Sequence, residues 1–289
     1  MPTLSDIKRR INAVKNTRQI TKAMKMVAAS KLRKAQSRML DMRPYADKMA
    51  QVIAGLSGDA EDLHPMLVQR PRNNIEVFVL TSDRGLCGAF NTNVMKAAER
   101  LILERRAESF NVSVCTVGKK AAEYFKRRNI KVRQAWTGMS GNLVYADVRK
   151  IAADIANHYM NEESDEVMIV YNTFRSVMIQ DVTVAGLMPL AASEEQVKTD
   201  EPVPIYLYEP SQQAILDQLL PKNVEVQIYR ALLESQASEE AARMTAMENA
   251  TQNADEMIGT LTLDYNKARQ ATITRELMDI VGGVEALKD

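Results

Sequence analysis

The sequence predicts a mixed α+β and α/β fold, in which the terminal helices form a long antiparallel coiled coil and the middle forms a Rossmann-like α/β domain. Apolar residues recur about every 3.5 positions at both ends of the 289-residue chain, whereas β-branched runs alternate with helical segments between them. The predicted parts are residues 1–57 for the N-terminal coiled-coil helix, 75–195 for the α/β domain and 207–289 for the C-terminal coiled-coil helix.

The first helix opens at Thr3, which forms a capping-box pattern with Asp6. Twelve of its fifteen seam positions are apolar, a pattern that indicates a coiled coil rather than an ordinary amphipathic helix. The seam consists of Ile7, Ile11, Val14, Arg18, Thr21, Lys25, Ala28, Leu32, Ala35, Met39, Met42, Ala46, Met49, Ile53 and Leu56. Pro44 lies inside the helix and predicts a local kink at a cost of about 3 kcal/mol.

Short strands and helices alternate in the middle of the chain, which favours a mainly parallel sheet. The predicted strands are residues 75–81, 112–117, 130–135, 167–171 and 177–187, and the predicted helices are residues 92–107, 119–128 and 145–161. Turn-rich stretches at residues 55–74 and 193–204 predict the domain boundaries.

The last helix repeats the seam pattern from Leu233 onward. Its seam consists of Leu233, Ala237, Glu240, Met244, Met247, Thr251, Ala254, Ile258, Leu261, Tyr265 and Ala268. Pro221 is predicted to separate this helix from a short one over residues 212–220, and Gly282 with Gly283 is predicted to end it.

The lengths of the two helices predict that the second extends beyond the first. At 1.5 Å per residue the helices measure about 75 Å and about 90 Å, which leaves an overhang of roughly 15 Å. Its apolar residues spread around the helix, so the tip needs an apolar sleeve from another chain. They are Ile273, Leu277, Met278, Ile280, Val281, Val284 and Leu287.

Charge is distributed unequally although the net charge is only +1. Residues 1–48 carry thirteen Lys or Arg against three Asp, whereas residues 193–289 carry eight basic against eighteen acidic residues, so the two ends suit each other as partners. Solvated helix faces explain the same charges equally well. The sequence contains no run of eighteen apolar residues and no apolar signal core, which favours a cytoplasmic chain.

The loop over residues 81–91 lies between a strand and a helix, where nucleotide-binding folds hold phosphate. It contains neither glycine-rich phosphate-binding pattern, since Gly85 and Gly88 are its only glycines and no lysine follows them. Cys87 is expected to be a buried packing residue, because neither His64 nor His158 is placed beside it as a base. No cofactor is therefore expected here.

Carboxylates such as Glu234, Glu239 and Glu248 fall outside the seam and are expected on solvated faces, with no spacing typical of metal ligands. The basic face of the first helix admits two kinds of partner. Nucleic acid is one, although no aromatic residue precedes Tyr45 for base stacking. Acidic protein loops are the other, held by salt-sensitive contacts. A small nucleotide-dependent α/β enzyme with helical arms is a third hypothesis.

Four blocks of sequence resemble the gamma subunit of bacterial F-type ATP synthases along nearly the whole chain. They are residues 7–34, residues 81–88 with Arg84, residues 239–247 (EEAARMTAM) and residues 265–281 (YNKARQATITRELMDIV). One departure is Gly283-Val284 followed by Glu285, where the family usually has Gly-Ala. The cysteine-bearing insertion of chloroplast members is absent, so the resemblance implies no thiol switch of that kind.

The resemblance implies a non-catalytic rotor stalk that couples proton flow to ATP synthesis. It implies one copy per complex, inside a head of alpha and beta subunits that carries the nucleotide chemistry, with the epsilon subunit and the ring of c subunits bound to the central domain. The implied location is the cytoplasmic face of the cell membrane, and no nucleic acid or metal is implied.

The resemblance also implies subunit-interface positions. Met24 and Lys25 fall where the stalk meets an acidic loop of a beta subunit, and Arg84 lies in the loop of the central domain. The positions implied to contact the head are Arg243, Arg269, Gln270, Thr274 and Glu276. Arg18, Thr21 and Lys25 interrupt the apolar seam, so they either set the register of the coil or are merely tolerated.

Overall fold

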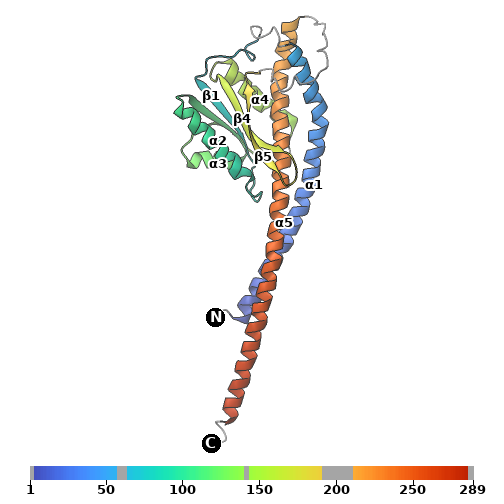
Figure 1. The fold of residues 1–289 in the computed structure, drawn as a ribbon, viewed down its shortest axis with the longest axis vertical. Coiled ribbons are helices and arrows are strands. Elements are labelled where there is room, and N and C mark those ends of the chain that lie inside the picture. Colours follow the sequence, from blue (N-terminus) through green and yellow to red (C-terminus); the bar gives the residue numbers. More distant parts are fainter. Residues whose placement is uncertain (1–2, 57–63, 140–142, 191–210, 286–289) are drawn as a thin grey trace. The chain divides into compact units, whose positions relative to one another are not determined.

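The computed structural model describes residues 3–56, 64–139, 143–190 and 211–285 (Figure 1). Its elements are α1 (Leu4–Leu56), β1 (Asn74–Leu80), α2 (Phe90–Ala107), β2 (Asn111–Val117), α3 (Lys119–Arg127), β3 (Val132–Trp136), α4 (Tyr145–Met160), β4 (Glu166–Phe174), β5 (Gln180–Met188) and α5 (Gln212–Glu285). All eight predicted central elements are therefore present, with ends shifted by a few residues at most. The predicted boundary at residues 193–204 lies outside the described residues.

The chain forms two compact units: residues 1–27 with 244–289, and residues 28–243. Both long helices pass through both units, so the division does not follow the ends of any helix. The predicted three-part division into residues 1–57, 75–195 and 207–289 stays a proposal.

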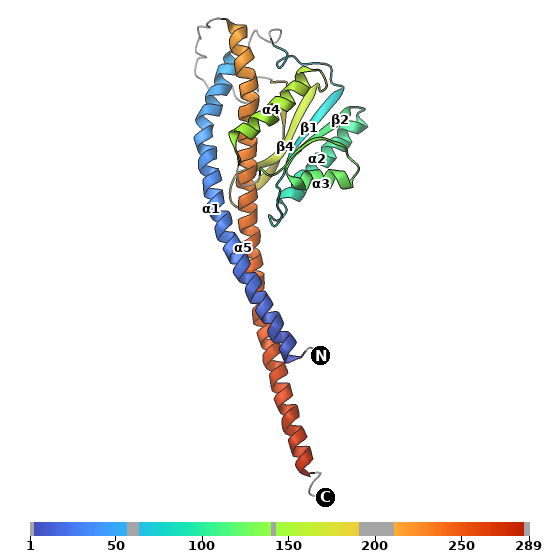
Figure 2. The same ribbon diagram turned by 180° about the vertical axis from the view of Figure 1, so that it is seen from behind.

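In the first unit, α1 and α5 lie side by side and antiparallel (Figures 1 and 2). The helix begins as predicted, because the Thr3 hydroxyl accepts the Asp6 N–H at 3.2 Å and the Asp6 carboxylate accepts the Thr3 N–H at 3.1 Å. Ile7, Ile11 and Thr21 of α1 are buried, as are Met247 and Ala254 of α5. The predicted seam is therefore confirmed in this unit.

The tip of α5 extends beyond the start of α1, as Figures 1 and 2 both show. Cross-helix contacts join Arg18 to Asp255, Thr21 to Thr251 and Lys25 to Glu248, and the same register places Leu4 opposite residue 269. About 16 residues of α5 then remain, an overhang of about 24 Å rather than the predicted 15 Å. About 5 Å of this excess arises because α5 continues through Gly282 and Gly283 to Glu285, where the sequence predicted its end.

Neither internal proline ends its helix. Pro44 lies inside α1, and Pro221 lies inside α5, where a break was predicted. Around Pro221 the buried residues Leu216, Leu220 and Val224 continue one apolar face of the helix. Burial of that face offsets the missing backbone hydrogen bond, so packing overrides the local preference of proline.

In the second unit, a five-stranded sheet has the order β3-β2-β1-β4-β5. The first three of its four pairings along that order are parallel, and β5 runs antiparallel at the edge, so the predicted mainly parallel sheet is confirmed. Strand β1 is buried on both faces. Ile75, Val77 and Val79 pack toward α2 and α3, whereas Phe78 and Leu80 pack toward α4 and α5. Figure 2 shows these helices beside the sheet. The sheet is thus a core layer between helices.

Candidate functional site

The carboxyl edge of the parallel strands is where open α/β folds bind ligands, at the point where the strand order reverses. Here β1 lies between β2 and β4, and the loop that follows β1 begins at Thr81. The Thr81 hydroxyl donates to the Val117 carbonyl at 3.0 Å and accepts the Ala121 N–H at 3.0 Å. Gly118 adopts φ 94°, and a Cβ there would lie 2.3 Å from the Thr81 carbonyl oxygen. The loop is thus fixed by bonds within the protein.

Helix α5 covers this edge of the sheet. The Ser238 hydroxyl donates to the Asn172 carbonyl at 3.2 Å, and Ser238 is fully buried. In the described part of the chain, the cavity that remains between Thr81, Gln236 and Glu239 measures about 30 Å³. This volume holds little more than a water molecule, whereas ligand pockets measure about 300–1,000 Å³. The nucleotide position of related folds is therefore occupied by the chain's own helix.

A buried charge cluster lies on α5 beside the 81–91 loop. Arg243 is 9% exposed, donates to Glu239, and contacts Glu240 with 2.9 Å between Nη1 and Oε1. Lys31 of α1 contacts the same Glu240 oxygen at 3.7 Å. Burial raises the pKa of Glu239, and Arg243 opposes that rise. The Arg243 guanidinium stays charged because its two carboxylates outweigh the cost of burial.

The prediction that Glu234, Glu239 and Glu248 lie on solvated faces is wrong for Glu234 and Glu239. Glu234 is 7% and Glu239 is 6% exposed, because α5 in this unit packs against both α1 and the α/β layer and has almost no solvent face. Glu248 is half-exposed and paired with Lys25.

Cys87 is 2% exposed, as predicted, and burial together with Glu239 raises the pKa of its thiol. Such a thiol is a poor nucleophile.

A second buried charge cluster links three strands to α4. Glu76 is fully buried on β1, accepts the Cys115 thiol at 2.9 Å and the Arg133 Nε at 2.7 Å, and Arg133 also contacts Asp154 at 2.7 Å. Burial raises the pKa of Cys115, so this thiol too is inert. Among the described residues, no group of three His, Cys, Asp or Glu side chains could hold a metal ion.

The predicted interface residues of the first unit lie on its coil. Met24 is half-buried, and Lys25 Nζ lies 2.5 Å from Glu248 Oε1. Arg18 Nη1 lies 2.8 Å from Asp255 Oδ1, and the Thr21 and Thr251 hydroxyls are 2.8 Å apart. Each of the three polar residues in the α1 seam thus has a polar partner on α5. In antiparallel register, the cations Arg18 and Lys25 of α1 fall opposite the carboxylates Asp255 and Glu248 of α5, so the charge pattern of the sequence is consistent with these pairs.

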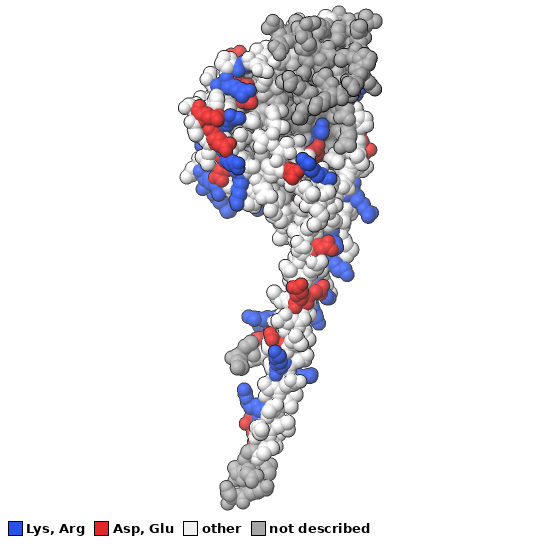
Figure 3. Space-filling model, viewed as in Figure 1, with Lys and Arg blue, Asp and Glu red and all other residues white. Residues whose placement is uncertain are grey.

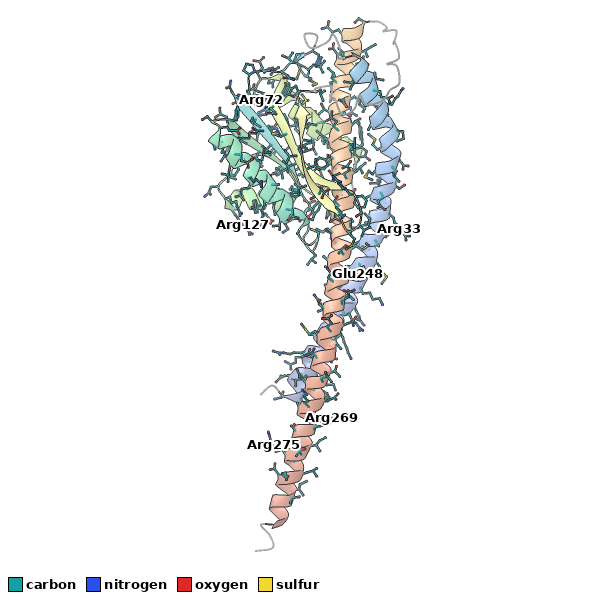
Figure 4. The ribbon with its side chains drawn as sticks, viewed as in Figure 1. Arg33, Arg72, Arg127, Glu248, Arg269 and Arg275 are labelled. Atoms are coloured by element: carbon teal, nitrogen blue, oxygen red, sulfur yellow. The ribbon has the colours of Figure 1, made fainter. Side chains whose placement is uncertain are left out.

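The other predicted residues are exposed at separate places. Arg269, Gln270, Thr274 and Glu276 are exposed on the terminal turns of α5, where the Thr274 hydroxyl bonds only the Gln270 carbonyl of its own helix. Figure 4 shows the Arg269 and Arg275 side chains extending from this part of α5. Arg84 is exposed in the loop after β1. The structure thus brings the four α5 residues onto one helical segment of the first unit, whereas Arg84 belongs to the second unit.

The tip of α5 also exposes apolar side chains. Ile273 is 49%, Leu277 57% and Met278 67% exposed, and Ile280 and Val281 are equally open. Among the described residues, no helix is long and apolar enough to span a membrane. An apolar tip on a polar coil indicates a protein-binding surface.

Two terminal helices that form an antiparallel coil, with an α/β sheet between them in the chain, are the architecture of a structural stalk. The family model described as ATP synthase matches residues 3–287. ATP synthase gamma chains of Trichlorobacter lovleyi and Geotalea daltonii are each 50% identical to the chain over 289 residues, covering 100% of both sequences. The chain therefore belongs to the gamma chains of the ATP synthase family, whose members are rotor-stalk subunits.

Solved structures agree with this assignment. A chain of the Tetrahymena thermophila mitochondrial ATP synthase central stalk and c-ring is 28% identical, with a TM-score of 0.62 over 80% of this chain and 99% of that one. A chain from the Euglena gracilis enzyme, in an assembly with the c-ring, has a TM-score of 0.69 at 22% identity over 98% of this chain and 94% of that one. At that identity, the second match shows the fold alone.

Proposed function

We propose that the chain transmits torque between the membrane ring of c subunits and the catalytic head of alpha and beta subunits, coupling proton flow to ATP synthesis. One copy would lie in each complex, with the epsilon subunit also bound, at the cytoplasmic face of the membrane. Membership of the gamma family and the two-helix coil with its apolar overhang support this proposal. The observation that carries it is the exposed apolar tip, which needs a sleeve from other chains.

We also propose that the chain is not an enzyme and that the beta subunits carry the nucleotide chemistry. The support is geometric: α5 covers the carboxyl edge of the sheet and leaves about 30 Å³ there. The two cysteines are buried with raised pKa values, which removes them as nucleophiles. Binding of nucleic acid is disfavoured, because two of the cations on the coil already hold carboxylates of α5.

The interface residues implied by the family remain proposals. Arg269, Gln270, Thr274 and Glu276 suit contact with the head because all four are exposed on the tip of α5. Arg84 suits a contact made by the central domain because it is exposed on a fixed loop. We propose that Met24 and Lys25 meet an acidic loop, with Lys25 exchanging Glu248 for a partner carboxylate.

Arg243 differs from these residues. A guanidinium that is 9% exposed and held by two carboxylates offers little surface to another chain. We propose that Arg243 does not contact a partner subunit directly. It acts as a positioning residue that neutralises Glu239 and Glu240 and so keeps α5 against the 81–91 loop.

Reconstitution tests the proposed function. The purified chain should show no ATP hydrolysis alone, and it should restore proton-coupled ATP synthesis to a head and membrane sector that lack this subunit.

Variants of the α5 tip test the observation that carries the proposal. Replacing Ile273 and Leu277 by Gln should weaken association with the head, because both are exposed on the apolar tip. The control Leu263→Gln should not weaken it, since Leu263 precedes the overhang. ATP turnover by the isolated chain, or equal behaviour of the two variants, would contradict the proposal.

A further inference from the structure

The ring of His64 holds a buried turn in the second unit. The side chain is 8% exposed, and its Nδ1 accepts the Met66 N–H at 3.1 Å. The His64 carbonyl also accepts the Leu67 N–H at 3.0 Å, which closes the turn over residues 64–67. Met66 and Leu67 are buried in one core cluster with Leu216 of α5. The ring therefore fixes a turn that packs against the start of α5.

This turn is joined to two further parts of the unit. The Met66 carbonyl accepts the Leu190 N–H at 2.8 Å, which ties the turn to the chain just after β5. On its other side, His64 Nε2 lies 3.7 Å from Asp217 Oδ1 of α5. Because Nδ1 accepts a hydrogen bond, the neutral ring carries its proton on Nε2, toward that carboxylate. A second proton must then go to Nδ1, where it meets the Met66 N–H and breaks the bond.

The surroundings of His64 do little to stabilise a charged ring. Asp217 faces the ring from α5, but the Asp217 side chain is 57% exposed, so water weakens its attraction. Residues 186–190 carry no charged side chain, and Arg70 donates to the Tyr159 carbonyl of α4. Burial therefore lowers the pKa of His64 below its ordinary value of 6.5, and Asp217 offsets this only in part.

The other histidine of the chain is bonded in the opposite sense. His158 Nδ1 lies 2.7 Å from Glu163 Oε2, so this nitrogen donates to a carboxylate, and the ring can take a second proton on Nε2 with that bond kept. His64 and His158 are the two histidines of the sequence. Protonation is thus compatible with the fold at His158, whereas it breaks a buried hydrogen bond at His64.

We propose that His64 is a pH-sensitive latch, which holds the 64–67 turn against α5 while the ring is neutral and releases the turn when the ring is protonated. A histidine whose pKa is lowered by folding contributes stability that is complete above its unfolded value of about 6.5 and is lost as pH falls through the folded-state value. Acidification below about pH 6.5 therefore loosens the turn, the chain after β5 and the start of α5. The latch belongs to the fold itself and acts whether or not the chain transmits torque.

Hydrogen exchange of the full-length chain tests the latch. Corrected for the intrinsic effect of pH on exchange, protection of the Met66 amide should fall about three- to tenfold between pH 7.5 and pH 5.5, because each pH unit between the two pKa values shifts opening by up to about tenfold. His64→Asn should keep this protection at both pH values, since an asparagine oxygen accepts the N–H two residues on and does not titrate. The matched control His158→Asn should keep the full response to pH.

A titration of the unaltered chain tests the latch even if His64→Asn fails to fold. The two histidines give two sets of ring C–H signals in NMR spectra, and His158→Asn assigns them. The His64 signal should titrate below pH 6.5, with the same midpoint as the loss of Met66 protection. A His64 ring that titrates at or above pH 6.5, or a Met66 amide whose protection falls equally in the unaltered chain and in His64→Asn, would overturn the proposal.

Discussion

The charged residues of α5 are held differently in the two units. In the unit of residues 28–243, Glu239, Glu240 and Arg243 are each less than 10% exposed and form one network. In the unit that contains residues 244–289, Glu248 and Asp255 pair with α1 through side chains that are 38–56% exposed. Figure 3 shows acidic and basic side chains at the surface of this coil. Buried charges resist change because each depends on its partners, whereas half-exposed charges can exchange partners at little cost. The comparison predicts where substitutions will disturb folding and where they will disturb binding.

The largest effect is expected from Arg243→Met. The change leaves the buried Glu239 and Glu240 without their main counter-ion, so the free energy of unfolding should fall by about 3–5 kcal/mol. Urea unfolding followed by circular dichroism measures the loss. The control Arg275→Met removes an exposed cation from the tip of α5 and should change stability by less than about 0.5 kcal/mol. Equal losses in the two variants would refute the distinction between the units.

A smaller, pH-dependent effect is expected from Glu239→Gln. Burial raises the pKa of Glu239 above its ordinary value of 4.5. The proton is therefore held more tightly in the folded chain, and this contribution to stability is complete below pH 4.5 and is lost as pH rises through the folded-state pKa. Relative to the unaltered chain, Glu239→Gln should thus gain stability between pH 5 and pH 8.

Urea unfolding at those two pH values tests this sign. The exposed Glu276 provides the control, because Glu276→Gln should track the unaltered chain at both pH values. A Glu239 variant whose relative stability is the same at pH 5 and pH 8 would show that the burial of this carboxylate is not coupled to folding.

Much of the fold follows from the sequence because periodicity reports burial directly. The seam positions of α1 and α5 are buried or half-buried wherever their side chains are described, and each predicted central strand is present. Interruptions were harder to predict. Pro221 and the glycine pair at residues 282–283 are strong local signals, yet α5 continues through all three. At Pro221 the signal is overridden by burial of its neighbours, which depends on contacts distant in sequence.

The burial of Glu234 and Glu239 was missed for a related reason. A heptad pattern describes how one helix faces one partner, whereas residues 231–241 of α5 face α1 on one side and the sheet on the other. Nearly every side chain in that range is buried. For the interface residues, sequence indicates which side chains are suited to contact, but the pairing of Lys25 with Glu248 depends on the register between the helices.

A moderate effect is expected at the threonine pair of the coil. The Thr21 and Thr251 hydroxyl oxygens lie 2.8 Å apart, and each also lies within hydrogen-bond distance of a carbonyl of its own helix, so a proton donated across the coil is taken from one of the two carbonyls. Either single change to Val should cost about 0.5–1.5 kcal/mol, whereas the double change should cost less than the sum of the two, because it removes both polar groups from the seam. A double-mutant cycle by urea unfolding measures the coupling. Strictly additive losses would mean that the two hydroxyls do not interact.

The smallest effect is expected at the ion pair between Lys25 and Glu248. Both side chains are about 40% exposed, so Glu248→Gln should lower the free energy of unfolding by less than about 1 kcal/mol, and the difference should disappear near 1 M salt. Glu256→Gln is the matched control, because Glu256 is an exposed carboxylate on the same helix. Binding should respond in the opposite direction: with Glu248 neutral, Lys25 is released, and association with an acidic partner should tighten at low salt. A variant that loses both stability and partner binding would mean that this pair, like the cluster around Arg243, belongs to the fixed framework of the protein.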